Sequence, residues 1–160
     1  MRIARRLTGW ISLAALVLLA FPGAARASHY DLTSIDLVEP DMAAKLAQLK
    51  VQTTEDLWKA TATPKQVGKL AGRLKVTPAR LRDWHDFCDL LRIVGVGPKV
   101  VRVMQLCGVK RIDQLVGQDP TALTAKIKST NAQASILGKL PDEDTVRNWI
   151  EQAKKLSSKK

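Results

Sequence analysis

The sequence has little of the chemistry that enzymes use. Its only two histidines are His29 and His85, and no nucleophile stands in a recognisable arrangement with a base. His85, Cys88 and Asp89 lie close enough on one predicted helix to touch a metal ion, but no second pair of ligands is spaced to complete the site. We therefore predict a protein that is not an enzyme and that has no metal, cofactor or small-molecule substrate, and we expect His85 at a helix surface.

Aromatic residues and cysteines are also few. Aromatic side chains make up 4% of the chain, which gives the bases of a single-stranded nucleic acid little to stack on. Three tryptophans, Trp58, Trp84 and Trp149, lie on predicted helices and are expected to anchor the core. The two cysteines, Cys88 and Cys107, allow two outcomes: a disulfide formed in an oxidising compartment, or two small buried thiols.

Only one long hydrophobic run is present, and it lies near the N-terminus. Residues 10–21 form an apolar stretch of twelve residues, which is too short to span a membrane comfortably. Three arginines precede it and Ala25-Arg26-Ala27 follows it, which is the order of a charged region, an apolar region and a cleavage site. Residues 1–27 are therefore predicted to be a secretion signal peptide, with an uncleaved N-terminal anchor as the alternative. We expect the mature protein in the periplasm or outside the cell, without a transmembrane span.

Acidic residues are in the minority. The full chain has a net charge of +11, and removal of four arginines with the signal peptide would leave 22 basic residues against 15 acidic ones, or +7. This excess favours anionic partners such as nucleic acid, acidic envelope polymers or anionic lipid headgroups, without choosing among them. Lys65, Lys69 and Arg73 follow one another at intervals of four residues on one predicted helix. This basic stripe is either an electrostatic binding surface or the solvated face of an amphipathic helix.

Strand-like alternation is absent, and apolar residues recur at helical spacing nearly throughout the chain after residue 27. Proline often follows a residue that can cap a helix, as in Thr63-Pro64, Thr77-Pro78 and Asp119-Pro120. These signals predict an all-α fold. The predicted helices cover residues 40–49, 54–60, 64–75, 78–92, 98–107, 112–117, 120–128 and 142–156.

The predicted helices form two similar sets. Val38-Glu39-Pro40 matches Val96-Gly97-Pro98 at an offset of 58 residues, and apolar positions continue to match at that offset. Leu81-Arg82-Asp83-Trp84 matches Val146-Arg147-Asn148-Trp149 after the offset has grown to 65. A repeat of this length is one supersecondary unit that buries its apolar face against its neighbour. We therefore divide the mature chain into a first repeat, residues 28–92, and a second repeat, residues 93–160, packed as one compact unit.

The segment between residues 93 and 104 contains the main candidate binding site. Gly95 can adopt a positive φ, and Gly97 leaves room for an anion beside the first amide groups of the next helix. Lys99 and Arg102 add positive charge near the positive end of that helix. Gly95, Val96, Gly97, Lys99 and Arg102 are therefore a candidate site for phosphate or for the nucleic-acid backbone. The alternative is that the glycines serve turn geometry alone.

Gly95-Val96-Gly97-Pro98-Lys99, followed by an apolar helix and Cys107-Gly108-Val109, resembles the helix-hairpin-helix motif of DNA repair and replication proteins. With its doubled architecture, the chain from about residue 33 to 156 resembles a bacterial family of uncharacterised exported or cytosolic proteins built from tandem helix-hairpin-helix units. The resemblance implies two such units and no established activity. It also implies that the amides of Gly95, Gly97 and Lys99 occupy the positions that touch phosphate in DNA-binding relatives.

The first hairpin departs from this pattern. It reads Asp36-Leu37-Val38-Glu39-Pro40-Asp41, without either glycine and with three carboxylates where phosphate would approach. Coulomb repulsion argues against anion binding there, and Glu39 is expected to cap the following helix. We therefore expect a non-catalytic binding or scaffolding module of the cell envelope whose partner is a protein. The alternative partners are an anionic polymer, and DNA bound sequence-independently through the second hairpin.

Overall fold

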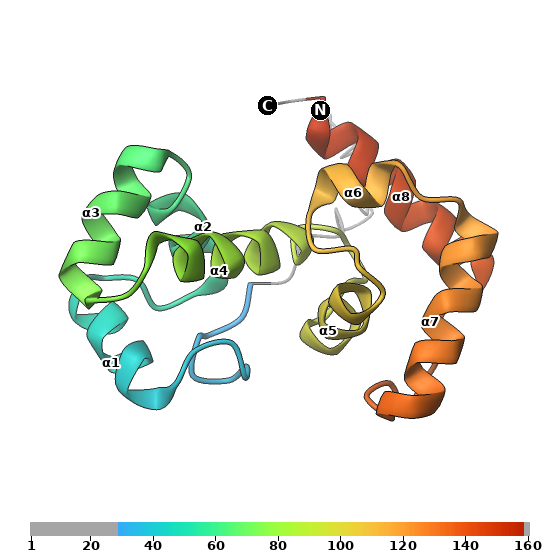
Figure 1. The fold of residues 1–160 in the computed structure, drawn as a ribbon, viewed down its shortest axis with the longest axis horizontal. Coiled ribbons are helices and arrows are strands. Elements are labelled where there is room, and N and C mark those ends of the chain that lie inside the picture. The colour runs from blue at the N-terminus through green and yellow to red at the C-terminus, as the bar shows by residue number, and fades with distance from the viewer. Residues whose placement is uncertain (1–28, 159–160) are drawn as a thin grey trace, which may run out of the picture.

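A computed structural model describes residues 29–158, which contain eight α-helices and no β-strand. The predicted all-α fold is confirmed for this part of the chain, and the predicted signal peptide lies outside it. None of the helices in residues 29–158 has the length and apolar character needed to cross a bilayer. The helices are α1 (Pro40–Gln48), α2 (Thr54–Ala60), α3 (Pro64–Leu74), α4 (Pro78–Leu90), α5 (Pro98–Leu106), α6 (Ile112–Val116), α7 (Pro120–Ala134) and α8 (Glu143–Ser157) (Figure 1).

The helices begin where the sequence has capping residues. The Thr53 side chain accepts a hydrogen bond from the Asp56 amide, and the Asp56 carboxylate accepts one from the Thr53 amide, which forms a capping box at the start of α2. Single side-chain caps start α3, α4, α7 and α8, and a proline opens α1, α3, α4, α5 and α7. All eight predicted helices are therefore present in residues 29–158, and each begins within one residue of its predicted start.

The largest departure from the predicted helices is the end of α7. We predicted that this helix ends at residue 128, but it continues to Ala134. The polar run from residue 129 to 131 interrupts the apolar spacing, yet Asn131 is buried and its side chain bonds within the fold. Its amide oxygen accepts from the N–H groups of Ile136 and Leu137 at 2.9 and 2.7 Å, and its amide nitrogen donates to the Leu137 carbonyl at 3.0 Å. These bonds satisfy backbone groups where the chain leaves α7. They stabilise an end of the helix at Ala134, which the apolar spacing of the sequence does not indicate.

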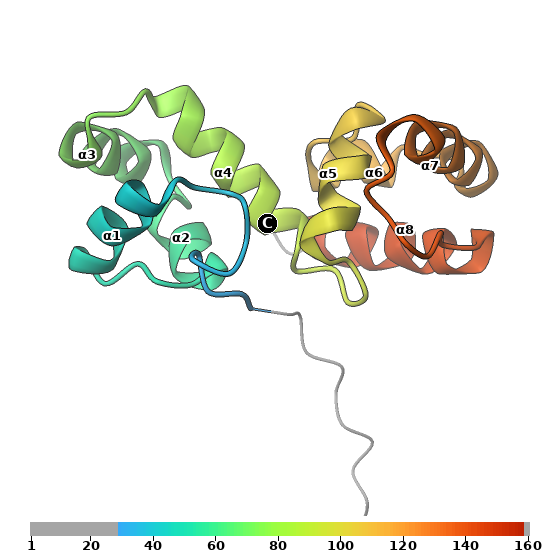
Figure 2. The same ribbon diagram turned by 90° about the horizontal axis from the view of Figure 1, so that it is seen from below.

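The helices form two lobes that α4 joins (Figures 1 and 2). α1, α2 and α3 surround one buried cluster, which includes Leu46, and α5 to α8 surround a second, which includes Met104. α4 contributes to both clusters, because Leu81 belongs to the first and Leu90 to the second. α3 lies at one end of the elongated molecule and α7 at the other.

Three helix pairs of the first lobe have counterparts in the second, and the contact between α2 and α3 has none of similar extent. α1 packs against α3, α2 against α4, and α3 against α4; likewise α5 packs against α7, α6 against α8, and α7 against α8. The apolar match in the sequence therefore marks matching core positions. The matched residues that are buried in both lobes are Val38 and Val96, Ala43 and Val101, Leu46 and Met104, Val51 and Val109, Leu57 and Leu115, Leu81 and Val146, and Trp84 and Trp149.

Two of the three tryptophans expected in the core are buried, and so are both cysteines. Trp84 and Trp149 are buried in the core as predicted, whereas Trp58 is only half-buried. Cys88 and Cys107 are free, buried thiols in different clusters, Cys88 in the first and Cys107 in the second. The structure therefore has the arrangement of two buried thiols, and the disulfide that an oxidising compartment would allow stays an untested prediction. Burial raises the pKa of the Cys88 thiol to about 12.

Candidate functional site

The chain between α4 and α5 forms a tight hairpin. The Val96 amide donates to the Ile93 carbonyl at 3.0 Å, and both side chains are buried. Gln152 of α8 binds the loop, because its Oε1 accepts from the Val94 amide at 2.8 Å and its Nε2 donates to the Val94 carbonyl at 3.3 Å. Gly95 is exposed at the tip and has a φ of 85°, so the expected left-handed conformation is present.

Two aromatic side chains approach the glycines of this hairpin. A Cβ atom at Gly95 would lie 3.3 Å from Nε1 of Trp149, and one at Gly97 would lie 3.5 Å from Oη of Tyr30. The positive φ therefore favours glycine at position 95, and a Cβ atom there would also need Trp149 to shift by a few tenths of an ångström. Gly97, in contrast, has a φ of −99°, which other residues adopt. Within residues 29–158 the amides of Gly95 and Gly97 donate no hydrogen bond. The hairpin thus keeps two amide donors, and Tyr30 lies beside the second of them.

The two predicted cations of the hairpin have different surroundings. Lys99 is exposed at the start of α5 and makes no ion pair in the described part of the chain. The Arg102 guanidinium donates to the backbone carbonyl of Asp36 and lies over the Phe87 ring, 5.1 Å from its centroid. Arg102 therefore ties α5 to the segment before α1, and a groove of about 450 Å³ runs between Tyr30 and Phe87 beside it.

The first hairpin is fastened to α4. Glu39 stands at the N-cap position of α1, but its side chain does not cap the helix as we predicted. Its carboxylate pairs with the Arg80 guanidinium of α4 instead, in a charge-assisted contact. A backbone hydrogen bond and this guanidinium hold the pKa of Glu39 below its usual value. Arg80 also lies over the Trp84 ring, 5.1 Å from its centroid, so this hairpin is held within the fold.

α3 has the predicted basic stripe on its exposed side. Val67 and Leu70 face the core, whereas Lys65, Lys69 and Arg73 are exposed. None of the three cations makes an ion pair within residues 29–158, and the helix itself contains no acidic residue. The stripe therefore places three positive charges, which no carboxylate of the described chain neutralises by contact, along about 12 Å of helix.

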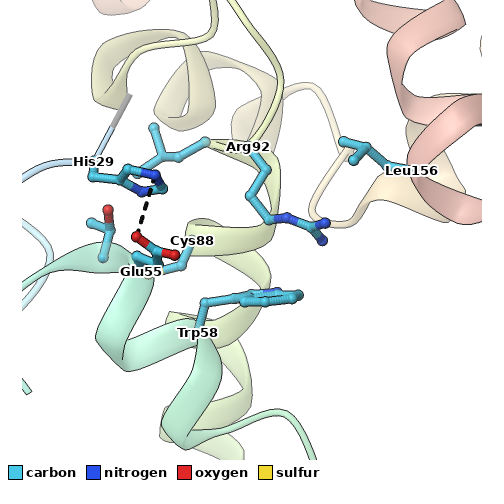
Figure 3. A pocket seen from close by; sticks show the side chains of 8 residues that line it. His29, Glu55, Trp58, Cys88, Arg92 and Leu156 are labelled. Atoms are coloured by element: carbon cyan, nitrogen blue, oxygen red, sulfur yellow. Dashed lines mark ion pairs between the residues drawn. The ribbon is translucent and has the colours of Figure 1, made fainter. Parts of the chain in front are cut away.

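A pocket between the lobes was not predicted from the sequence. It has a volume of about 210 Å³, and Trp58 of α2, Arg92 after α4 and Leu156 of α8 line it (Figure 3). Arg92 lies over the Trp58 ring, 4.1 Å from its centroid, and donates to the Asp89 carboxylate at 2.7 Å. Trp58 Nε1 donates to the same oxygen at 3.0 Å. Asp89 is only 3% exposed, so these two donors compensate a buried negative charge.

The surroundings of this pocket include two histidines. Nε2 of His29 lies 3.4 Å from a Glu55 oxygen, and both residues line the pocket (Figure 3). His85 was expected at the helix surface, but it is half-buried: its ring stacks on Trp58 with centroids 6.1 Å apart, and its Nδ1 lies 2.9 Å from the Thr61 hydroxyl. These partners are more than 20 residues apart in sequence, so no local motif could have indicated them. Among residues 29–158, no three His, Cys, Asp or Glu side chains gather as metal ligands.

Comparison with known proteins gives one result about the family. The chain matches no curated protein and no solved structure. The family described as "Domain of unknown function (DUF4332)" matches residues 37–156, a range that begins just before α1 and ends within the last turn of α8. Because this range covers well over half of the 160 residues, the chain belongs to the DUF4332 family.

Proposed function

We propose that this protein is a non-catalytic binding or scaffolding module whose partner is another protein. The observation that carries the proposal is the different use of its two sets of cations. Arg102 of the second hairpin is bound to the Asp36 carbonyl, whereas Lys65, Lys69 and Arg73 on α3 are exposed and lack an ion pair within residues 29–158. Lys99 of the hairpin is also exposed and lacks an ion pair there, but it is a single cation, whereas α3 offers three along one helix face. Such a row of charges suits a polypeptide surface better than a phosphate group held in a hairpin.

The two lobes are, in this proposal, diverged copies of a helix-hairpin-helix unit. The matching contacts of α1–α4 and α5–α8 support this interpretation, as do the matching buried residues. The two hairpins also occupy corresponding places, because each precedes a helix that begins with proline, Pro40 in one copy and Pro98 in the other. Only the second hairpin has glycines, so the first copy has kept the fold without the groups that an anion would need.

The proposed place of action is the cell envelope or the medium outside the cell. The support comes from residues 1–27, whose charged region, apolar run and Ala25-Arg26-Ala27 have the order of a secretion signal. Cell fractionation with N-terminal sequencing tests this point. A processed chain that begins at Ser28 in the envelope or medium fraction supports it, and a full-length chain in the cytosol contradicts it.

DNA binding is the second candidate function, and three observations favour it. Gly95 is exposed, the amides of Gly95 and Gly97 donate no hydrogen bond within residues 29–158, and Lys99 is exposed beside the positive end of α5. Two observations weigh against it: the Tyr30 hydroxyl lies beside Gly97, and Arg102 is already bound to a backbone carbonyl. Such a site would grip the sugar-phosphate backbone and would not read bases.

Fluorescence anisotropy with a labelled DNA duplex separates the two functions. We expect the chain without residues 1–27 to bind DNA no more tightly than about 10⁻⁵ M at physiological salt, in the range of non-specific binding. We also expect the Gly97→Glu variant to bind equally weakly. Tight binding whose log affinity falls linearly with log salt, and which Gly97→Glu abolishes without changing the helical circular dichroism spectrum, would establish the nucleic-acid function and contradict our proposal.

A further inference from the structure

Positive charge is concentrated in one segment of the first lobe. Residues 57–82 include seven Lys and Arg residues and no Asp or Glu. Lys59 pairs with Glu55 at 2.7 Å, and Arg80 pairs with Glu39, so two of the seven are neutralised by contact. The other five make no ion pair within residues 29–158, and three of them stand on α3. α3 is therefore a local positive surface at one end of the molecule (Figure 1).

We use "the α3 face" for Lys65, Lys69 and Arg73, which are exposed and stand at intervals of four residues. Each interval corresponds to a rise of about 6 Å along the helix. Carboxylates placed at every fourth residue of a second helix have the same rise. Two such helices lying side by side can therefore pair several charges at once.

A groove beside α3 adds apolar contact to these charges. It has a volume of about 190 Å³ and lies between α3 and the chain around the end of α1, where Leu49, Val51 and Leu70 line it together with Lys69 and Arg73. An apolar side chain can enter such a groove while neighbouring carboxylates pair with the cations at its rim. A phosphate backbone has no apolar side chain to place there. Within residues 29–158 the exposed large hydrophobic residues are Leu106 and Leu140, so α3 has none to insert into a bilayer.

Two glycines on α3 leave space next to the cations. Gly68 and Gly72 are exposed, and a Cβ atom at either position would meet no atom within 4 Å. Neither has a positive φ, and glycine destabilises a helix interior relative to alanine, so the lobe itself does not require them. Their lack of side chains lets the backbone of a partner approach α3 closely. The charge and the groove carry the inference, and the glycines agree with it.

We propose that the α3 face and its groove bind an acidic amphipathic helix of a partner protein. This assignment rests on the proposed function, because it names the partner class of a protein-binding module. The partner helix lies along α3, with Asp or Glu at every fourth position against the three cations and an apolar side chain in the groove.

NMR titration of the ¹⁵N-labelled chain without residues 1–27 tests this assignment. The probe is a synthetic helical peptide of about 20 residues with Glu at every fourth position and Leu on the adjoining face. We expect shift changes at residues 64–74 and around Leu49 and Val51, and an affinity at least about tenfold higher than that of a scrambled peptide of the same composition. The double variant Lys65→Glu, Lys69→Glu should lower that affinity by at least about tenfold.

The matched control lies on the other lobe. Lys126 and Lys128 of α7 are exposed and lack an ion pair within residues 29–158, so Lys126→Glu, Lys128→Glu changes the net charge by the same amount. We expect this variant to bind the peptide within about twofold of the unchanged chain, because the substitutions are distant from α3. Gly68→Gln, Gly72→Gln, which fills the open space with a good helix former, should weaken binding by at least about fivefold.

Several outcomes would overturn the assignment. Equal losses in the α3 and α7 variants, or equal binding of the scrambled peptide, would mean that net charge alone attracts the peptide. A DNA duplex or a phosphatidylglycerol vesicle that binds the α3 face more tightly than the peptide would replace the polypeptide partner with another class. The proposed function survives these results if another surface binds a protein, and it fails separately if Gly97→Glu abolishes tight DNA binding.

Discussion

Lys50 and Gly108 occupy the same left-handed backbone position, one after α1 and the other after α5, with φ values of 61° and 83°. The next residue closes each helix in the same way, because Val51 donates to the Leu46 carbonyl at 3.0 Å and Val109 donates to the Met104 carbonyl at 2.9 Å. This is the Schellman pattern that ends many helices, and it usually has glycine at the left-handed residue. The two lobes therefore share the same type of helix end, but only the second lobe has glycine at the left-handed position.

Substitutions at the two left-handed positions, 108 and 50, should change the free energy of unfolding in opposite directions. Gly108→Ala should lower the free energy of unfolding by about 1 kcal/mol, because a Cβ atom is disfavoured in the left-handed region. An added Cβ there meets no atom within 4 Å, so the effect is conformational. Lys50→Gly should raise the free energy of unfolding by up to about 1 kcal/mol for the same reason. Urea denaturation measures both, and a Lys50→Gly variant less stable than the unchanged chain would contradict the shared conformation.

The raised pKa of the Asp86 carboxyl should make the stability of the protein depend on pH. Burial raises the pKa of Asp86 from its ordinary 3.8 to about 6, while Arg111 opposes the shift. The folded state thus holds this proton more tightly than the unfolded state, and its contribution to stability is lost as the pH rises from about 4 to about 6. Asp86→Asn should abolish that part of the pH dependence, which we expect to be about 1 kcal/mol because the carboxyl remains partly solvated. Denaturation curves from pH 4 to 7 measure it, and a constant difference between the two proteins would contradict the shift.

The buried carboxylate of Asp89 makes Arg92 important for stability. Removing the guanidinium in Arg92→Met takes away the ion-pair partner at 2.7 Å from a carboxylate that is only 3% exposed, and we expect a loss of about 3 kcal/mol in the free energy of unfolding. Lys154 provides the control, because its pair with Glu151 at 2.7 Å is exposed on both sides, and Lys154→Met should change stability by less than about 1 kcal/mol. Urea denaturation measures the free energy of unfolding of both variants. Equal losses in Arg92→Met and Lys154→Met would contradict the stabilising role of the Arg92–Asp89 pair.

The two thiols are predicted to be free and unreactive. Cys88 and Cys107 are buried in different clusters, and the raised pKa of Cys88 keeps its thiol protonated at neutral pH. Ellman's reagent at pH 8 should label neither thiol in the folded protein and both in urea without reductant. Detection of only disulfide-linked cysteine in the denatured, unreduced protein would contradict the structure.

Much of the fold could be predicted because its signals are local. Each capping residue with a following proline, as at Thr63 and Thr77, sets a helix start from within a few residues of sequence. The end of α7 could not be predicted this way, because Asn131 bonds to a loop that its own sequence pattern does not describe.

The candidate site was predictable only in part. The glycines of the second hairpin were identified from their spacing, and Gly95 has the expected conformation. The bond from Arg102 to the Asp36 carbonyl spans 66 residues, and the contact between Trp58 and Asp89 spans 31. Such contacts depend on how the lobes pack, so the sequence could not indicate that Arg102 is engaged within the fold or that a pocket lies between the lobes.

Site-specific photo-crosslinking in the producing cell tests most directly whether this module binds a protein. A photoreactive amino acid at Gln66 samples the α3 groove, and one at Lys99 samples the second hairpin. We predict a protease-sensitive adduct from position 66, lost when Lys65 and Lys69 are replaced by Glu, and no nucleic-acid adduct from position 99. A nuclease-sensitive adduct from position 99, with none from position 66, would contradict this account.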